Sequence, residues 1–296
     1  MSRYCHVLQP MDDGTPMPRR LLITVSEDAA FLHGMRFIIH FFSPATDLKL
    51  DLVLMPPTSS AGISANPLLL EKAVALAEKM FFEKGFETSA LQIEEGLQQC
   101  PTINELAGLA EQGHYDAVVL GRRGAARLEE YLVERYQEAV FDENLDFPFW
   151  VCREPDLTRD NVLLCVDGSK QGLCAADHVG FMCQNEGRHS ICVAYLADPL
   201  QRDPRDEKLI IENAVRMLEV NEIPAKRIST KVLAEKDYVQ GILREADQGR
   251  YAVVAVGRAG TGRGMMYERQ FGSVSLRLAR TLTKASLWIC GYPCKL

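Results

Sequence analysis

The chain has 296 residues, of which 47% are hydrophobic and 25% charged, and its formal net charge is −7. This composition is typical of a globular protein with room for two domains of ordinary size. The acidic balance argues against general affinity for nucleic acid or anionic membrane, because phosphate surfaces require clustered Lys and Arg. The apolar runs are too short to span a membrane and Met1–Leu8 lacks the apolar core of a signal peptide, so we expect a cytoplasmic protein.

The first half of the chain alternates apolar strand patterns with helical patterns after a polar stretch, residues 1–18, which we expect to be a mobile leader. Strands are predicted at 21–25, 48–55, 88–94, 117–120 and 149–152, and helices at 29–42, 66–82, 103–112 and 128–140. The helix at 66–82 has the clearest signals, with Asn66 as N-cap, Pro67 in the first turn and Gly85 as the stop. Residues 121–124 are predicted to be a loop with its arginines on a solvated rim.

After a short polar linker at 153–156, the second half repeats this order. Strands are predicted at 162–166, 191–196, 228–233, 253–256 and 287–290, and helices at 170–183, 206–220, 239–247 and 274–282. Each half therefore has the pattern βαβαβαβαβ.

Short motifs recur between the two halves at nearly constant spacing. Gln112-Gly113 recurs as Gln248-Gly249, an offset of 136 residues (248 − 112), and Gly121-Arg122 recurs as Gly257-Arg258 at the same offset. Trp150 matches Trp288 at an offset of 138 (288 − 150), so the second copy has a two-residue insertion between these anchors. The sequence therefore indicates an internal duplication with domains at 19–157 and 158–296.

Alternating strands and helices with continuous apolar strands predict an α/β fold, in which a parallel sheet is covered on both faces. Right-handed crossovers make each half a doubly wound five-stranded sheet, most simply in the order 3-2-1-4-5. Ligands in such sheets bind beyond the carboxyl ends of strands 1 and 4. In the second half these ends carry Asp167-Gly168-Ser169 and a glycine-rich loop from Gly257 to Ser273, which leads into a helix and is suited to phosphate.

These motifs resemble those of the universal stress protein family: an Asp-Gly-Ser turn after strand 1, Gly257-x-x-Gly260 after strand 4, and Gly272-Ser273 at the start of a helix. The duplication covers nearly the whole chain, which is therefore most similar to a tandem universal stress protein with an adenine nucleotide alpha hydrolase-like fold. The stretch between Gly260 and Gly272 is two residues longer than the family's usual spacing, in line with the insertion.

The resemblance implies that the second half binds ATP or a related adenine nucleotide, with or without Mg²⁺. Asp167 and the strand end near Leu196 would lie around the base and ribose. The residues implied around the triphosphate are Gly257, Gly260, Gly272, Ser273 and Val274, and Arg258 could add charge-assisted bonds to phosphate. The family's usual dimer implies that the two halves pack as an intrachain pseudo-dimer through their fifth strands, and that the chain could form a homo-oligomer.

The first half departs from the same pattern. Ser26 stands where Asp167 stands, and Glu134 and Arg135 stand where Gly272 and Ser273 stand. A carboxylate in place of the glycine would repel phosphate and fill its space. We therefore expect nucleotide binding in the C-terminal domain alone.

Several alternatives remain open from the sequence. Asp167-Gly168-Ser169 can be a simple turn in which Ser169 caps a helix, and the glycine loop can be a connector without a ligand. Cysteines recur at 165, 174, 183 and 192, and we expect these to be buried thiols and not metal ligands. No common catalytic motif is present, so the sequence favours a regulatory stress-response protein with an unidentified protein partner over an enzyme. The alternatives are a nucleotide-free scaffold and a slow ATP hydrolase in which Asp167 holds Mg²⁺.

Overall fold

The computed structural model describes residues 18–57, 66–92, 98–138, 147–200, 203–258 and 273–291. The first half contains strands β1 (Arg19–Val25), β2 (Leu48–Leu54), β3 (Leu91–Gln92), β4 (Ala117–Leu120) and β5 (Phe149–Val151), with helices α1 (His33–Phe41), α2 (Pro67–Glu83), α3 (Ile103–Gln112) and α4 (Arg122–Glu138). The second half contains β6 (Asp160–Val166), β7 (Ile191–Ala197), β8 (Ile228–Ala234), β9 (Tyr251–Gly257) and β10 (Ser286–Cys290), with α5 (Lys170–Cys183), α6 (Pro204–Val220), α7 (Tyr238–Gln248) and α8 (Ser273–Thr281). Short 3-10 turns are η1 (Ala29–Phe31), η2 (Thr88–Ala90) and η4 (Ala225–Arg227).

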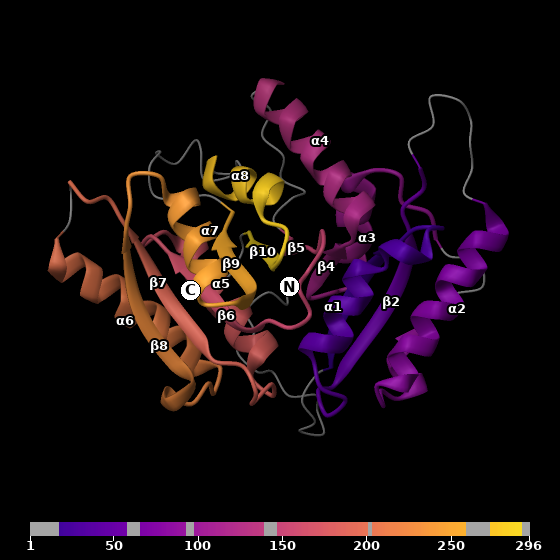
Figure 1. The fold of residues 1–296 in the computed structure, drawn as a ribbon, viewed down its shortest axis with the longest axis horizontal. Coiled ribbons are helices and arrows are strands. Elements are labelled where there is room, and N and C mark those ends of the chain that lie inside the picture. The colour runs from indigo at the N-terminus through magenta and orange to yellow at the C-terminus, as the bar shows by residue number, and fades with distance from the viewer. Residues whose placement is uncertain are drawn as a thin grey trace.

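The ten strands among the described residues form one sheet in the order β3-β2-β1-β4-β5-β10-β9-β6-β7-β8 (Figure 1). Each half has the predicted order 3-2-1-4-5 with parallel neighbours. The two five-stranded sheets are continuous because β10 pairs antiparallel with β5, the fifth-strand contact that the resemblance implies. The strands of the two halves therefore run in opposite directions, and their carboxyl ends lie at opposite edges of the sheet.

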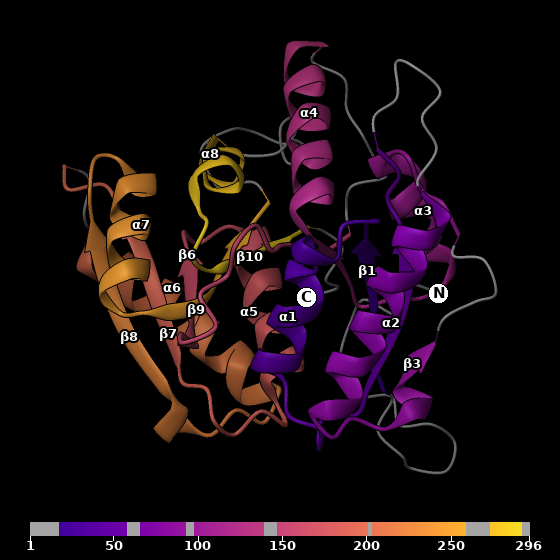
Figure 2. The same cartoon turned by 45° about the vertical axis from the view of Figure 1, so that its right-hand side comes forward.

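Helices cover both faces of the sheet, as the continuous apolar strands predict. Alternate residues of β6 enter different cores: Val162, Leu164 and Val166 pack on the side of α1, α2, α5 and α6, whereas Leu163 and Cys165 pack on the side of α3, α4, α7 and α8. In both views α4 projects from the body of the molecule near α8 (Figures 1 and 2).

Helix α4 begins at Arg122, so the predicted loop at 121–124 is wrong. The helix starts directly after β4, and the amide of Ala125 already donates to the carbonyl of Gly121. Gly124 allows this close start, because a Cβ there would lie 3.0 Å from Leu120 and from the Thr24 hydroxyl. Strand β3 is also shorter than predicted, since a 3-10 turn takes up its first residues.

Two tryptophans lie directly opposite each other where the halves join. Trp150 of β5 pairs with Trp288 of β10, and their rings stack 3.9 Å apart at 6°. Both side chains are fully buried, and the indole N–H of Trp150 donates to Nε2 of His178 on α5 at 3.0 Å. The seam between the halves is thus an aromatic core and not a polar domain boundary.

Each half also caps a helix end of the other. Arg19 of β1 donates through Nε and Nη2 to the carbonyl of Phe181 in the last turn of α5, at 2.9 and 2.8 Å. In return, Arg188 donates to the carbonyls of His40 and Phe41 at the end of α1. Cations near the last carbonyls of a helix are stabilising because they complement the helix dipole.

His189 completes this cap as a neutral imidazole. Its Nε2–H donates to the Phe41 carbonyl at 2.7 Å, its Nδ1 accepts the Asn161 amide at 3.3 Å, and its ring stacks on Phe41. Burial lowers the pKa of His189, and Arg188 adds to that shift. The Phe41 hydrogen bond and the carboxylates of Glu186 and Asp160 oppose it.

We expect the protein to lose stability as the pH falls below about 6.5, because His189 is protonated more readily in the unfolded chain. The loss ends once the folded-state pKa is passed, and it is at most about 1.4 kcal/mol per pH unit for one group. Urea unfolding of the wild type and of His189→Gln at pH 7.5 and 5.5 measures it. Gln keeps a donor and an acceptor but does not titrate, so the variant should show the weaker pH dependence. Equal slopes for both proteins would contradict this role.

Candidate functional site

The carboxyl end of β6 carries the predicted Asp167-Gly168-Ser169 turn. Oδ1 of Asp167 accepts the Ser169 amide at 3.0 Å, and the Ser169 hydroxyl accepts the Gly172 amide at 3.0 Å as the N-cap of α5. Gly168 has a φ of +83°, which favours glycine, and a Cβ there would meet Ile210 of α6 at 2.9 Å. These hydrogen bonds stabilise the turn and the start of α5. This structural role is compatible with a ligand contact by Asp167.

The end of β9 packs tightly against the start of α5. A Cβ on Gly257 would lie 2.7 Å from the carbonyl carbon of Gln171 and 2.8 Å from the amide nitrogen of Gly172. The backbone φ of Gly257 is not positive, so glycine is needed here for close packing and not for its backbone conformation.

Arg258 is buried, with 1% of its surface exposed, where the sequence predicted a cation available to phosphate. Its amide donates to the Cys290 carbonyl at 2.8 Å, and its own carbonyl accepts the Ser275 hydroxyl at 2.7 Å. Ser275, which the sequence analysis overlooked, thereby ties the first turn of α8 to the end of β9.

Of the other predicted residues, Ser273 is exposed at the first position of α8, and Val274 and Leu196 are half-buried. Both Val274 and Leu196 pack against the core on the α7 and α8 face. Gly260 and Gly272 lie outside the described residues. The predicted site residues that the structure describes thus lie around the carboxyl ends of β6, β7 and β9.

Two tyrosines at this edge were missed by the sequence analysis. Tyr195 lies near the end of β7 and Tyr238 is the first residue of α7, and both are half-buried. Burial raises the pKa of each hydroxyl, and the Asp167 carboxylate contributes to both shifts. Nothing in the sequence marks these two tyrosines as site residues, because tyrosines are common in protein cores. Their position near Asp167 follows from the register of β7 and the start of α7.

An ion pair at the same edge links α7 to α8. Arg277 donates from both terminal nitrogens to the Asp237 carboxylate at 3.1 and 2.9 Å, and this hydrogen bonding lowers the pKa of Asp237. Asp237 is also the N-cap of α7. The arginine is therefore already paired with a carboxylate.

The corresponding edge of the first half is filled by its own side chains. Arg123 of α4 donates to both oxygens of Glu27 at 2.5 and 3.0 Å and to the Met55 carbonyl at 3.0 Å. This hydrogen bonding lowers the pKa of Glu27. The Thr24 hydroxyl donates to the Val119 carbonyl and accepts the Gly121 amide. Arg123, which the sequence predicted to lie on a solvated rim, thus bridges the ends of β1, β2 and β4.

The structure describes all four of the cysteines that recur at intervals of nine residues. Cys165, Cys183 and Cys192 are buried free thiols, whereas Cys174 is disulfide-bonded, which differs from the expectation of four thiols. Burial raises the pKa of Cys183 to about 12. Within the described ranges no group of three or more His, Cys, Asp and Glu is arranged to hold a metal ion.

Among the residues that the structure describes, no helix is both long and apolar enough to cross a membrane.

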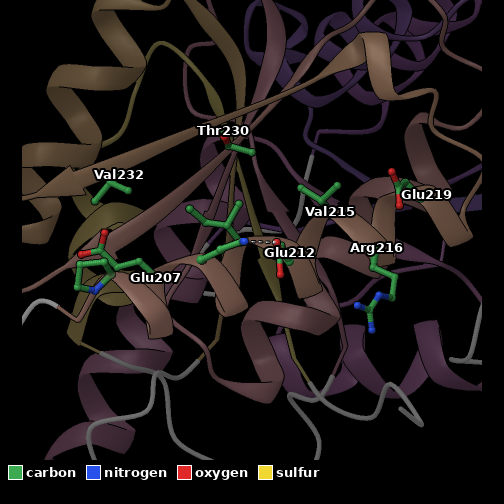
Figure 3. A pocket seen from close by; sticks show the side chains of 10 residues that line it. Glu207, Glu212, Val215, Arg216, Glu219, Thr230 and Val232 are labelled. Atoms are coloured by element: carbon green, nitrogen blue, oxygen red, sulfur yellow. Dashed lines mark ion pairs between the residues drawn. The ribbon is translucent and has the colours of Figure 1, made fainter.

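A cavity of about 770 Å³ lies between α6 and strand β8 (Figure 3). Its lining mixes apolar side chains such as Ile211 and Val215 with charged ones, including the ion pair between Lys208 and Glu212 at 3.7 Å. Thr230 and Val232 of the edge strand close the other side. We assign the candidate site to the Asp167 edge instead, because the cavity lining carries three glutamates and two cations, Lys208 and Arg216, which does not favour a phosphate ligand.

Comparisons with known proteins identify the fold. No protein-family model matches the chain, and no curated protein matches its sequence. A universal stress protein from Archaeoglobus fulgidus aligns with 92% of this chain and 98% of its own, at 13% identity and a TM-score of 0.59. A functionally unknown protein from Pseudomonas aeruginosa aligns over 92% of both chains, at 11% identity and a TM-score of 0.50. At these identities the likeness concerns the fold: the chain has the fold of a universal stress protein.

Proposed function

We propose that this chain is a cytoplasmic tandem universal stress protein, with domains at 19–157 and 158–296, in which the C-terminal domain alone binds ATP. The observation that carries this proposal is the difference between the two strand edges. The first is closed by Arg123 and Glu27, whereas the second has the Asp167 turn, two half-buried tyrosines and a helix start at Ser273.

The described residues suit the nucleoside end of the ligand. Asp167 can accept ribose hydroxyls, and Leu196 and Val274 offer partly exposed apolar surface for a base on the face of α7 and α8. At the phosphate end, α8 begins at Ser273 and presents the amides of its first turn, which favour an anion. The remaining predicted phosphate contacts, Gly260 and Gly272, are outside the described residues.

The first half lacks this helix start. Residues 134 and 135, which match Gly272 and Ser273, lie within the continuous helix α4 that starts at Arg122. Amides inside a helix are bonded to carbonyls of the preceding turn and are not available to phosphate. This supports a single nucleotide site per chain.

The proposed role is regulatory: nucleotide binding would change how the protein engages a partner. The sequence has no common catalytic motif, and Arg277 at the Asp167 edge is paired with Asp237. Slow ATP hydrolysis with Asp167 holding Mg²⁺ is the second candidate. Phosphate release that falls to background in Asp167→Ala would favour it.

Titration calorimetry with ATP, with and without Mg²⁺, tests the proposed site. The wild type should bind, and Gly272→Glu, which copies the first half, should bind at least about tenfold more weakly because a carboxylate repels phosphate. Gly108→Glu is the matched control, because this glycine of α3 has open space around it. Its affinity should equal that of the wild type. Equal binding by all three proteins would refute the site, and absence of binding in the wild type would favour the scaffold hypothesis.

A further inference from the structure

The sheet ends in very different strands on its two sides. Strand β3 at the edge of the first half has two residues, whereas β8 at the edge of the second half has seven, all paired with β7. Among the strands that the structure describes, β8 is the last of the sheet, and its residues Ser229, Thr230 and Lys231 are exposed. A long edge strand carries a row of backbone donors and acceptors that can pair with another chain, and a very short edge strand prevents this.

A lysine in an edge strand commonly opposes such pairing through its charge. Lys231 is instead paired, because its Nζ lies 2.6 Å from Oε2 of Glu245 on α7. On the opposite face of β8, Thr230 and Val232 line the cavity beside α6 (Figure 3). The edge of β8 and the flank of α6 therefore form one continuous surface.

The flank of α6 along this cavity carries charges of alternating sign. Lys208, Glu212, Arg216 and Glu219 line the cavity in this order, and all four are exposed. The point midway between 208 and 219 is 213.5, and the point midway between 212 and 216 is 214. A two-fold axis at this level places Lys208 opposite Glu219, and Glu212 opposite Arg216, of an antiparallel second copy. The stripe is thus complementary to itself.

The same axis meets β8 at Thr230. Helix α6 leaves the carboxyl edge of the sheet at Pro204 and β8 reaches that edge at Ala234, so the two elements run in opposite directions. Residue 214 lies about 15 Å along α6 from Pro204, and Thr230 lies about 13 Å along β8 from Ala234. In Figure 3, Thr230 accordingly lies toward the middle of the cavity lining.

An antiparallel β8 pair centred on Thr230 brings compatible side chains together. In this register Thr230 faces itself, Val232 faces Ile228 and Lys231 faces Ser229 of the other copy. Threonine pairs and aliphatic pairs are favourable across strands, and the two lysines are not opposite each other.

The first half lacks this stripe. Helices α2 and α6 have 17 residues each and begin with proline, at an offset of 137 (204 − 67). Glu71, Ala75, Lys79 and Phe82 therefore stand at the positions of the four charges. Alanine and phenylalanine interrupt the alternation, so two copies of α2 would not pair their charges in this way.

We propose that the protein forms a two-fold symmetric homodimer in which β8 pairs antiparallel with β8 of a second copy. The two α6 flanks pair their charges around an apolar centre, to which each copy contributes the half-buried Ile211 and Val215. The interface differs from the contact between β5 and β10, which joins the halves within one chain. It does not depend on the nucleotide site.

Size-exclusion chromatography with light scattering tests the dimer on the full chain, whose mass is 33.1 kDa. The wild type should have twice this mass. Lys208→Glu with Arg216→Glu makes the stripe acidic, and Glu212→Lys with Glu219→Lys makes it basic, so each double variant should have a dissociation constant at least about tenfold higher. An equimolar mixture of the two should recover the dimer, because opposite charges then face each other.

Glu71→Lys with Lys79→Glu is the matched control, because it exchanges the charges at the equivalent positions of α2. This variant should dimerise as the wild type does. Thermal unfolding followed by circular dichroism, with matching transitions, shows that the compared proteins are folded.

Cross-linking tests the register of the strands. Thr230→Cys places two thiols on the axis within reach of a disulfide, so the oxidised variant should run as a covalent dimer on a non-reducing gel. Ser229→Cys is the control, because each thiol then faces Lys231 and the two are too far apart to bridge. The wild type in parallel gives the background from the native cysteines.

Three results would overturn the proposal. A wild type that stays monomeric at about 100 μM would refute the dimer. Failure of the mixed acidic and basic variants to recover a dimer would refute the pairing of the α6 flanks. A dimeric Thr230→Cys that does not cross-link above the Ser229→Cys control would show that the copies associate through another surface.

Discussion

Replacing Trp150 by alanine is expected to lower the free energy of unfolding by about 3–5 kcal/mol, the range for truncating a fully buried aromatic side chain. Trp150 is completely buried and stacks on Trp288 at 3.9 Å. It also contacts Phe37 edge-on at 6.4 Å and Phe42 in a stacked arrangement at 6.0 Å. Alanine would leave a cavity lined by rings from both halves, which rigid strands on either side cannot close.

The substitution also removes a hydrogen bond across the seam. Trp150 belongs to the first half, and its indole N–H donates to His178 of α5 in the second half. Trp150→Phe keeps most of the ring but loses this donor, so we expect a smaller loss, about 1–3 kcal/mol. The difference between the two variants separates ring packing from the hydrogen bond.

Urea unfolding followed by far-UV circular dichroism measures these losses, with Leu209→Ala as the control. Leu209 of α6 is 56% exposed, and its truncation should change stability by no more than about 0.5 kcal/mol. A double-mutant cycle with Trp288→Ala should give a coupling energy of at least about 0.5 kcal/mol, because the two rings are in direct contact. Additive losses, or a loss below 1 kcal/mol for Trp150→Ala, would show that the seam is not a shared core.

Periodicity and capping signals predicted most of this fold. Helix α5 spans Lys170–Cys183 as predicted, because Ser169 provides an N-cap and the apolar strand before it ends abruptly. The internal repeats predicted two sheets of the same order, and the family's dimer implied the contact between β5 and β10. The start of α4 was missed because Gly121 and Gly124 indicate a loop locally, whereas packing of Gly124 against Leu120 and Thr24 allows a helix.

The candidate site was less predictable, because its residues are specified by tertiary contacts. Asp167 and Ser169 were found through a local turn, in which the Asp167 carboxylate accepts the Ser169 amide and Ser169 caps α5. The burial of Arg258 could not be predicted, since an arginine after a strand is ordinarily exposed. Tyr195 and Tyr238 are far apart in sequence and meet the same edge only through the register of β7 and the start of α7.

Gly257 illustrates how a motif residue can serve packing as well as a ligand. Its missing side chain lets the end of β9 approach the backbone of α5 at Gln171 and Gly172, where a Cβ would come within 2.7 Å. Real Cβ atoms do not approach backbone atoms so closely, so either β9 or α5 would have to move. The strand is held by β6 and β10 on both sides, and the Ser169 cap fixes the start of α5.

Gly257→Ala should therefore lower the free energy of unfolding by about 1–3 kcal/mol, as expected for overpacking at a rigid position. Gly108→Ala is the matched control: a Cβ there has nothing within 4 Å, and replacing a glycine inside helix α3 should stabilise the protein by about 0.5–1 kcal/mol. Urea unfolding in the absence of nucleotide measures both changes, so that any ligand contribution is excluded. Opposite signs for the two substitutions establish close packing as a reason for glycine at 257. A neutral or stabilising Gly257→Ala would remove that reason and leave the approach of phosphate as the explanation for this residue.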